Sequence, residues 1–217
     1  MRPLIPGYAY ELTQLGGGTQ VLRFEGIGPG FRFEDVLRIT HDRSLYLDNV
    51  LACLETRSAI CFIDMALGTL RRKRSLHHAV PAFSVRDPGH VYVSGTQELR
   101  FVKRSGGAIQ YPKEWPGAQT QEVFRAIIYQ AGCLLADTYD PLLESVIEDV
   151  REALYQYELR AWRRKREKAN RTEREHDDAG RHKPWRSEPD GAPFDSYEIE
   201  LRPVGPDGHI LLNEEHA

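Results

Sequence analysis

The chain has 217 residues, of which 41% are hydrophobic and 28% are charged, an ordinary composition for a globular protein that buries a core. The net charge is −3, and no apolar run comes near the roughly 18 residues that a membrane-spanning helix needs. The three cysteines lack metal-binding spacing, and residues 1–10 lack the apolar centre of a signal peptide, so we expect a cytoplasmic protein with reduced thiols.

The first 80 residues predict a β-hairpin followed by a helical hairpin. Residues 8–12 and 21–24 read as two strands, and a glycine-rich loop lies between them. Apolar residues at spacings of three and four predict two helices, at residues 33–49 and 55–77. Residues 1–80 therefore form the first predicted unit.

Residues 81–176 predict a second unit of the same kind. Asp140 is suited to cap a helix that begins at Pro141, because proline lacks the N–H that would be unpaired there. Trp115 is expected to pack between sheet and helices, with exposed stacking on a ligand as the alternative. We expect three strands and two helices, at residues 91–93, 98–102, 108–111 and 120–137, and from residue 141 to about 176.

The two units repeat one pattern. A shift of 87 residues aligns residues 22–70 with residues 109–157 without a gap, and nine positions are identical. The identities fall on the Pro-Gly before the helices and on the apolar stripes, where Leu47 matches Leu134. We interpret this pattern as an internal duplication.

Residues 177–217 predict a linker and a last β-hairpin. Glycine and proline recur in the linker, and the hairpin strands are expected at residues 197–202 and 209–212. The fold class that follows is α+β, with tandem units of a β-hairpin and an antiparallel two-helix hairpin, and an additional C-terminal β-hairpin.

The sequence shows no set of residues that predicts catalysis. The glycines of residues 26–30 lack the pattern of a phosphate-binding loop, and no nucleophile motif is present. His77 and His78 are adjacent but have no accompanying ligand pattern, so no metal is expected. We therefore predict a protein that is not an enzyme and needs no cofactor.

The most distinctive chemical feature is a basic stripe at residues 160–186, with eleven Lys or Arg against five Asp or Glu. Arg160 and Arg164 are four residues apart, on one face of the helix, and could grip a phosphate in bidentate fashion. The alternative is a solvated helix end whose arginines pair with Glu158 and Glu167.

Several short motifs resemble those of a phage helical-hairpin family. The motifs are Asp42-Arg43, Cys53-x-Glu55, the Ala-Leu pairs, and Glu158-x-Arg160-x-x-x-Arg164. That family includes the Thoeris anti-defence sponges and related anti-CBASS sponges. Its members oligomerise and sequester nucleotide immune signals without cleaving them.

The resemblance implies a viral sponge in the host cytoplasm that binds a cyclic ADP-ribose isomer or a cyclic oligonucleotide, and that forms a homo-oligomer. The implied ligand-binding residues are Arg160 and Arg164, their first-copy counterparts Lys73 and His77, and also Arg43 and Trp115. One alternative is a phage accessory protein that binds nucleic acid through the basic stripe at residues 160–186. Another is a structural phage protein that only oligomerises.

Overall fold

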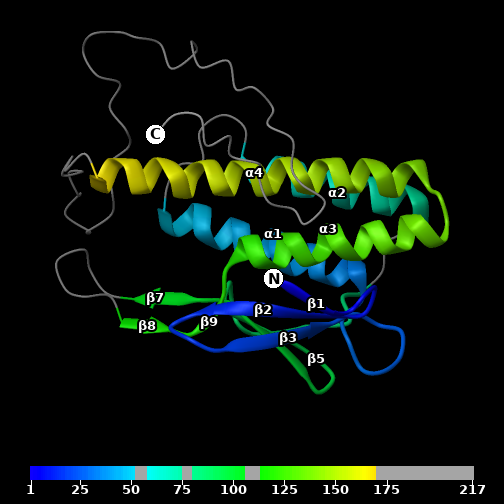
Figure 1. The fold of residues 1–217 in the computed structure, drawn as a ribbon, viewed down its shortest axis with the longest axis horizontal. Helices are drawn as coiled ribbons and strands as arrows, with labels where there is room; N and C mark the ends of the chain where they lie inside the picture. Colours follow the sequence, from blue (N-terminus) through cyan, green and yellow to red (C-terminus); the bar gives the residue numbers. More distant parts are fainter. Residues whose placement is uncertain (52–57, 75–79, 106–112, 170–217) are drawn as a thin grey trace, which may run out of the picture.

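The computed structural model describes residues 1–51, 58–74, 80–105 and 113–169. Within these ranges the chain has the predicted α+β class, with a layer of helices above antiparallel strands (Figure 1). The expected strand at residues 108–111 and the C-terminal hairpin lie outside the described residues. No helix in the described ranges has both the length and the hydrophobicity needed to cross a membrane.

Each unit contributes three strands in chain order to an antiparallel sheet, and the short strand β9 pairs with β2 to make the first sheet four-stranded. The edge strands β1 and β4 were not predicted, because nearly all their side chains are exposed and no alternation marks them. The first sheet contains β1 (Arg2–Ile5), β2 (Ala9–Leu15) and β3 (Thr19–Arg23), and the second contains β4 (Ser84–Asp87), β5 (Val91–Ser94) and β6 (Gln97–Arg100). Three short strands follow, β7 (Lys103–Ser105), β8 (Lys113–Trp115) and β9 (Gly117–Ala118).

Two antiparallel helical hairpins cover the strands. They consist of α1 (Phe33–Leu51) with α2 (Ala59–Arg74), and α3 (Thr120–Asp137) with α4 (Pro141–Ala169). In Figure 1, α1 and α3 lie next to the strands and α4 lies on their far side. The predicted cap is confirmed, because the Asp140 carboxylate accepts a hydrogen bond of 2.9 Å from the Leu142 N–H at the start of α4.

The two units repeat the same local contacts. The Gly7 N–H donates to the Tyr10 hydroxyl at 3.0 Å, and the Gly89 N–H donates to the Tyr92 hydroxyl at 2.9 Å. Both glycines have a positive φ, of 71° and 72°. The aromatic rings repeat as well, since Tyr10 meets Phe24 edge-on and Tyr92 meets Phe101 edge-on. Leu47 and Leu134 are both partly buried against the core, as the duplication requires.

The repeat is not gapless outside the helices. The structure matches Phe24 with Phe101, and not with Tyr111 as the 87-residue shift predicts, because both rings make the same contact. The second unit carries ten additional residues between Phe101 and Gly117, where β7 and β8 form a separate hairpin. Its β5–β6 hairpin is in turn five residues shorter than the β2–β3 hairpin.

Each sheet is fastened to the first helix of the other unit. The Tyr10 hydroxyl donates to Gln130 on α3 at 3.0 Å, and the Tyr92 hydroxyl donates to Asp42 on α1. Strand β2 also pairs with β9, through Gln14 and Ala118. All of these elements contribute to one continuous hydrophobic cluster, so the described parts of the two units interlock around a shared core.

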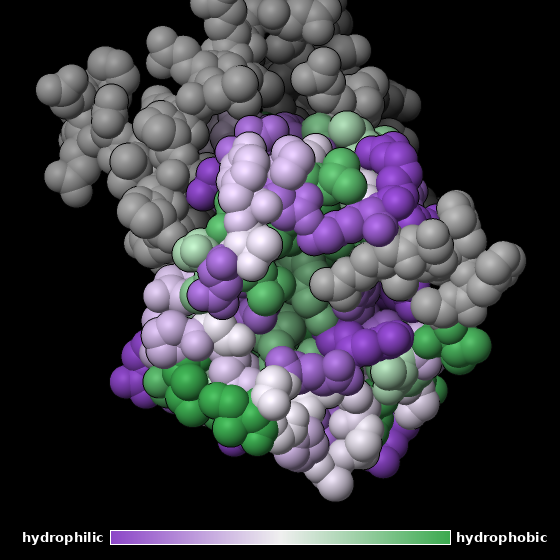
Figure 2. Space-filling model, turned by 90° about the vertical axis from the view of Figure 1, so that its right-hand side faces the viewer, coloured by the Kyte–Doolittle hydropathy of each residue, from purple (hydrophilic) through white to green (hydrophobic). Residues whose placement is uncertain are grey.

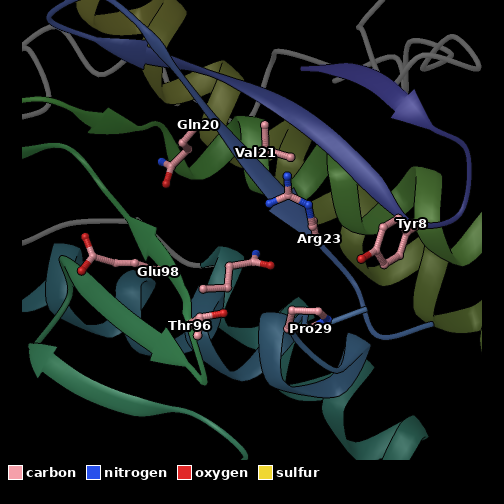
Figure 3. Close-up of a pocket in the computed structure, with 8 residues that line it drawn as sticks. Tyr8, Gln20, Val21, Arg23, Pro29, Thr96 and Glu98 are labelled. Carbon is pink, nitrogen blue, oxygen red and sulfur yellow. The ribbon is translucent and has the colours of Figure 1, made fainter. Parts of the chain in front are cut away.

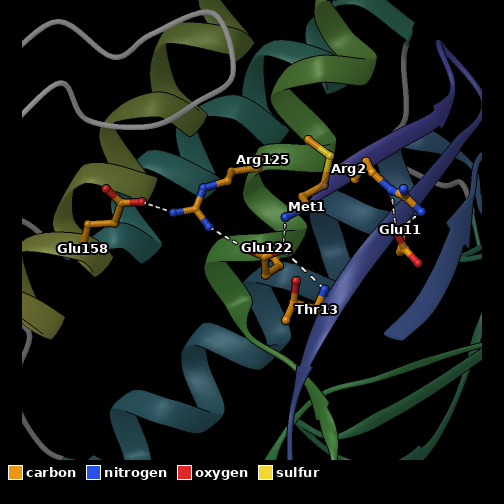
Figure 4. Close-up of polar contacts among 7 residues, drawn as sticks. All are labelled: Met1, Arg2, Glu11, Thr13, Glu122, Arg125 and Glu158. Atoms are coloured by element: carbon orange, nitrogen blue, oxygen red, sulfur yellow. Dashed lines mark hydrogen bonds and ion pairs between the residues drawn. The ribbon is translucent and has the colours of Figure 1, made fainter. Parts of the chain in front are cut away.

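A series of polar contacts links the N-terminus, β2, α3 and α4 on another side of the core (Figure 4). Arg125 on α3 contacts Glu122 at 2.7 Å and also pairs with Glu158 on α4. Glu122 accepts hydrogen bonds from the Met1 amino group and, at 3.4 Å, from the Thr13 N–H. Burial by itself raises the pKa of Glu122, but these partners outweigh burial and lower it.

Candidate ligand-binding groove

An open groove of about 390 Å³ lies between the β2–β3 hairpin and the β5–β6 hairpin. Figure 3 shows Gln20, Val21 and Arg23 on one wall, Thr96 and Glu98 on the other, and Tyr8 and Pro29 at one end. Gln97 also lines this groove. Elsewhere, Figure 2 shows a hollow with a hydrophobic floor between the helical and strand layers at one end of the molecule.

The difference in hairpin length explains why the groove is open. The tip of the long β2–β3 hairpin reaches the second unit, where Leu15 pairs with Gly117 on β9. The tip of the shorter β5–β6 hairpin meets the first unit at Ser94, whose hydroxyl donates to the Gly30 carbonyl at 3.4 Å. The two units are arranged approximately as a twofold pair. The groove lies where the β5–β6 hairpin is too short to cover the first unit in the way that the β2–β3 hairpin covers the second.

Gln97 has a buried amide without a partner. In the repeat it corresponds to Gln20, whose amide binds the backbone of Arg100 with its nitrogen at 2.6 Å and its oxygen at 3.1 Å. Gln97 is 8% exposed, and neither atom of its amide meets a hydrogen-bonding partner in the described part of the chain. Buried amides are nearly always paired, so Gln97 is an exception among the residues that line the groove.

Arg23 supplies a cation to the same groove. Its counterpart Arg100 is bound by Glu98, which accepts hydrogen bonds of 3.0 and 2.5 Å from that guanidinium. The residue matching Glu98 in the first unit is Val21, which has no charge. Among the described residues, Arg23 makes no ion pair or side-chain hydrogen bond, so its guanidinium is free to bind an anion.

Arg43 is placed in the interior and not at a surface that a ligand can reach. The residue is 4% exposed, and its guanidinium donates to the carbonyls of Gly89 at 2.7 Å and Val102 at 2.8 Å. It also lies 5.5 Å from the centre of the Phe101 ring. The expected ligand-binding role of Arg43 is therefore replaced by a structural one, in which it ties α1 to the second sheet. Burial, followed by the charge of Arg43, lowers the pKa of the neighbouring His90 to about 4.

The other predicted residues are not brought together. Lys73 pairs with Asp140 at the start of α4, whereas Arg160 lies twenty residues further along, about 30 Å away at 1.5 Å per residue. Arg160 is half-buried, while His77 and the side chain of Arg164 lie outside the described residues. Because α2 and α4 run in opposite directions, the two copies of the predicted clamp would lie at opposite ends of the helical layer.

Trp115 lies away from the strands that form the groove. It ends β8, it is 39% exposed, and the Lys103 ammonium lies 5.8 Å from the centre of its ring. This contact satisfies one face of the ring with a cation from the chain itself. Neither the packing role nor the stacking role expected for Trp115 contributes to the groove.

The groove residues belong to a repeat that is visible in the sequence, but not at the single shift of 87 residues. Gln20-Val-Leu-Arg-Phe24 returns as Gln97-Glu-Leu-Arg-Phe101 at a shift of 77 residues. Pro-Gly-x-x-Tyr ends at Tyr10 and again at Tyr92, at a shift of 82 residues. Aligning the strands separately from the helices would have paired the two glutamines and the two arginines.

Comparisons of this chain with protein-family models, curated proteins and solved structures give no match. In the described ranges, no group of three or more His, Cys, Asp or Glu side chains could hold a metal ion. The candidate site therefore rests on the geometry of the groove.

Proposed function

We propose that this protein binds a small phosphorylated nucleotide in the groove and holds it without transforming it. This is the role of the nucleotide sponges that the sequence resembles. The observation that carries the proposal is the Gln97 amide, which is buried without a partner in a residue that lines the same groove as the free guanidinium of Arg23. Leaving a buried amide unpaired costs about 1–3 kcal/mol, and a ligand that paired with it would offset that cost.

The chemistry of the groove walls fits the parts of a nucleotide. A guanidinium binds phosphate oxygens through charge-assisted hydrogen bonds, which suits Arg23 for the anionic end. A glutamine amide offers one donor direction and one acceptor side by side, which matches the edge of a base. Tyr8 at the end of the groove offers an aromatic face on which a ring can stack.

The one carboxylate among the groove-lining residues is already occupied. Glu98 accepts hydrogen bonds from Arg100 and, at 3.3 Å, from Arg86. Both oxygens of this carboxylate are engaged by guanidinium groups, so it is poorly placed to take a proton from a ligand. The groove therefore favours binding without chemistry.

The proposal is tested by calorimetric titration of the protein with adenosine monophosphate, a cyclic ADP-ribose isomer and cyclic oligonucleotides. Arg23→Ala should weaken the binding of the preferred ligand by roughly ten- to hundredfold, since a charge-assisted hydrogen bond contributes about 1.5–3 kcal/mol. Arg2→Ala is the matched control, because it removes the same charge from β1, where Arg2 pairs with Glu11 outside the groove. Equal affinities for the parent protein and Arg23→Ala would contradict the proposal.

A second variant, Gln97→Met, is expected to change stability and nucleotide affinity in different directions. It removes the unpaired amide while keeping the side-chain shape, so the melting temperature should stay the same or rise while nucleotide affinity falls. A variant that loses stability and keeps its affinity would show that the amide serves the fold alone.

One further variant and a salt series separate this site from those expected from the sequence. Arg160→Lys should leave binding in the groove unchanged, because α4 lies on the far side of α1 and α3 from the strands (Figure 1). If Arg160→Lys weakens binding and Arg23→Ala does not, the site belongs at the helix end. Affinity that falls steeply with salt for every polyanion would indicate nucleic-acid binding through the basic stripe at residues 160–186.

A further inference from the structure

We infer that the groove closes on a bound nucleotide, and that Gln97 completes the closure by binding the main chain of Arg23. The inference rests on the proposed function and describes how the same groove responds to its ligand. It follows from a contact that one half of the internal repeat makes and the other half leaves unmade.

The contact that is made joins Gln20 on β3 to Arg100 on β6. The Gln20 amide donates to the Arg100 carbonyl at 2.6 Å and accepts from the Arg100 N–H at 3.1 Å. The Phe101 N–H donates to the His90 carbonyl at 2.7 Å, and hydrogen-bonded pairs alternate along an antiparallel ladder. Arg100, which pairs with Val91, therefore turns its N–H and C=O to the open edge of β6, where Gln20 binds them.

The main chain of Arg23 is arranged in the same way, but one of its groups has no partner. The Phe24 N–H donates to the Tyr8 carbonyl at 2.8 Å. Arg23 lies one position along the ladder, opposite Ala9, so its N–H and C=O face the open edge of β3. The C=O accepts a hydrogen bond of 2.9 Å from the Phe31 N–H, whereas no described residue accepts one from the Arg23 N–H on that edge.

Gln97 is the residue that the repeat assigns to this N–H. It corresponds to Gln20 in the recurring Gln-x-Leu-Arg-Phe segment, and both polar atoms of its amide are buried without a partner in the described part of the chain. A hydrogen bond from the Arg23 N–H to the Gln97 oxygen would therefore satisfy two groups that the open groove leaves unpaired. A glutamine amide has two N–H donors and an oxygen with two lone pairs, so it can bind Arg23 and a ligand together.

The β5–β6 hairpin is the wall that can move. The tip of the β2–β3 hairpin is fixed by strand pairing with β9. At the tip of the β5–β6 hairpin, the Ser94 hydroxyl meets the Gly30 carbonyl at 3.4 Å, which is long for a hydrogen bond. Gln97 pairs with Ser94 next to this tip, so a small rotation of the hairpin would carry Gln97 toward β3.

The charge of Arg23 explains why closure needs a ligand. Among the described residues its guanidinium has no ion pair, and taking water from an unpaired charge is costly. A bound phosphate neutralises this charge, and the Thr96 hydroxyl on the opposite wall can donate to the same ligand (Figure 3). A ligand that contacts both walls binds the closed groove more tightly than the open one, and so shifts the protein toward closure.

The test measures amide hydrogen exchange at Arg23 and Arg100 by NMR in the full protein, with and without nucleotide. The nucleotide is adenosine monophosphate, a cyclic ADP-ribose isomer or a cyclic oligonucleotide, whichever binds most tightly in the calorimetric titration. Saturation with it should slow exchange at Arg23 by about tenfold or more relative to Arg100, because the closed groove protects the Arg23 N–H. Arg100 is the internal reference, since Gln20 binds its N–H whether the groove is open or closed.

Three variants identify the group that protects the Arg23 N–H. Gln97→Met removes the amide, and Gln97→Asn keeps an amide on a side chain one methylene shorter. In both variants, at saturating nucleotide, the slowing at Arg23 should fall below about twofold. Gln20→Met is the matched control, because it should speed exchange at Arg100 and leave the slowing at Arg23 intact.

The outcomes separate closure from binding. If the nucleotide binds but exchange at Arg23 does not slow relative to Arg100, the groove stays open and the inference is overturned. Equal slowing in the parent protein and in both Gln97 variants would also overturn it, because the ligand itself would then shield the N–H. If none of the three kinds of nucleotide binds, the proposed function fails, and closure on a ligand fails with it.

Discussion

Replacing Gly89 with alanine tests the interlocked packing of the two units. Gly89 has a φ of 72°, and a Cβ at this position would lie 2.3 Å from Cγ of Tyr46 on α1. The left-handed conformation costs an alanine roughly 1–2 kcal/mol. Pushing the Tyr46 ring aside adds the cost of overpacking, about 1–3 kcal/mol. We therefore expect the free energy of unfolding to fall by about 2–5 kcal/mol.

Gly7 supplies the matched control. It has the same turn and a φ of 71°, but a Cβ there would meet Cβ of Cys133 at 3.5 Å, an ordinary contact. Gly7→Ala should therefore cost only the conformational term, about 1–2 kcal/mol. Urea unfolding followed by tryptophan fluorescence measures both variants. Equal losses of unfolding free energy in Gly89→Ala and Gly7→Ala would refute the reasoning, because the close approach of Gly89 to Tyr46 on α1 would then add no cost.

Three further predictions concern stability. The pKa of His90 is lowered to about 4, so unfolding should be favoured progressively by up to about 3 kcal/mol as the pH falls from 6.5 to 4; His90→Gln should flatten that part of a pH series of urea titrations. Gln20→Ala should lower the free energy of unfolding by about 1 kcal/mol, because two hydrogen bonds to the Arg100 backbone are lost, and a melt unchanged from the parent would contradict this. Asp140→Ala should cost about 1 kcal/mol in the same assay, since α4 loses its cap, whereas Asp140→Asn should recover most of that loss.

The sequence predicted the helices well because their information is local. Apolar spacing located α1 and α3, and the Asp140-Pro141 pair located the start of α4. Strands β1 and β4 were missed because neither shows the alternation of a half-buried strand. The expected second helix of the first unit, at residues 55–77, is described only as Ala59–Arg74.

The groove could not be predicted in the same way. The availability of Gln97 depends on a difference between two hairpins, since Gln20 has found backbone partners and Gln97 has not. The density of basic residues in the sequence instead predicted a site at Arg160 and Arg164, whose helix lies on the far side of α1 and α3 from the groove (Figure 1). Arg43 shows the opposite case, because a charged residue in a helix pattern predicts exposure, while tertiary contacts bury it.

The exchange of sheets between units also constrains how the chain can fold as it is synthesised. Tyr10 is 120 residues away from Gln130, its partner on α3, so the first sheet lacks this helix until most of the chain has left the ribosome. Contacts of such high sequence separation slow folding and leave apolar surface exposed meanwhile. The N-terminal half should therefore depend on chaperones during translation, and acquire protection from proteolysis only after α3 has been made.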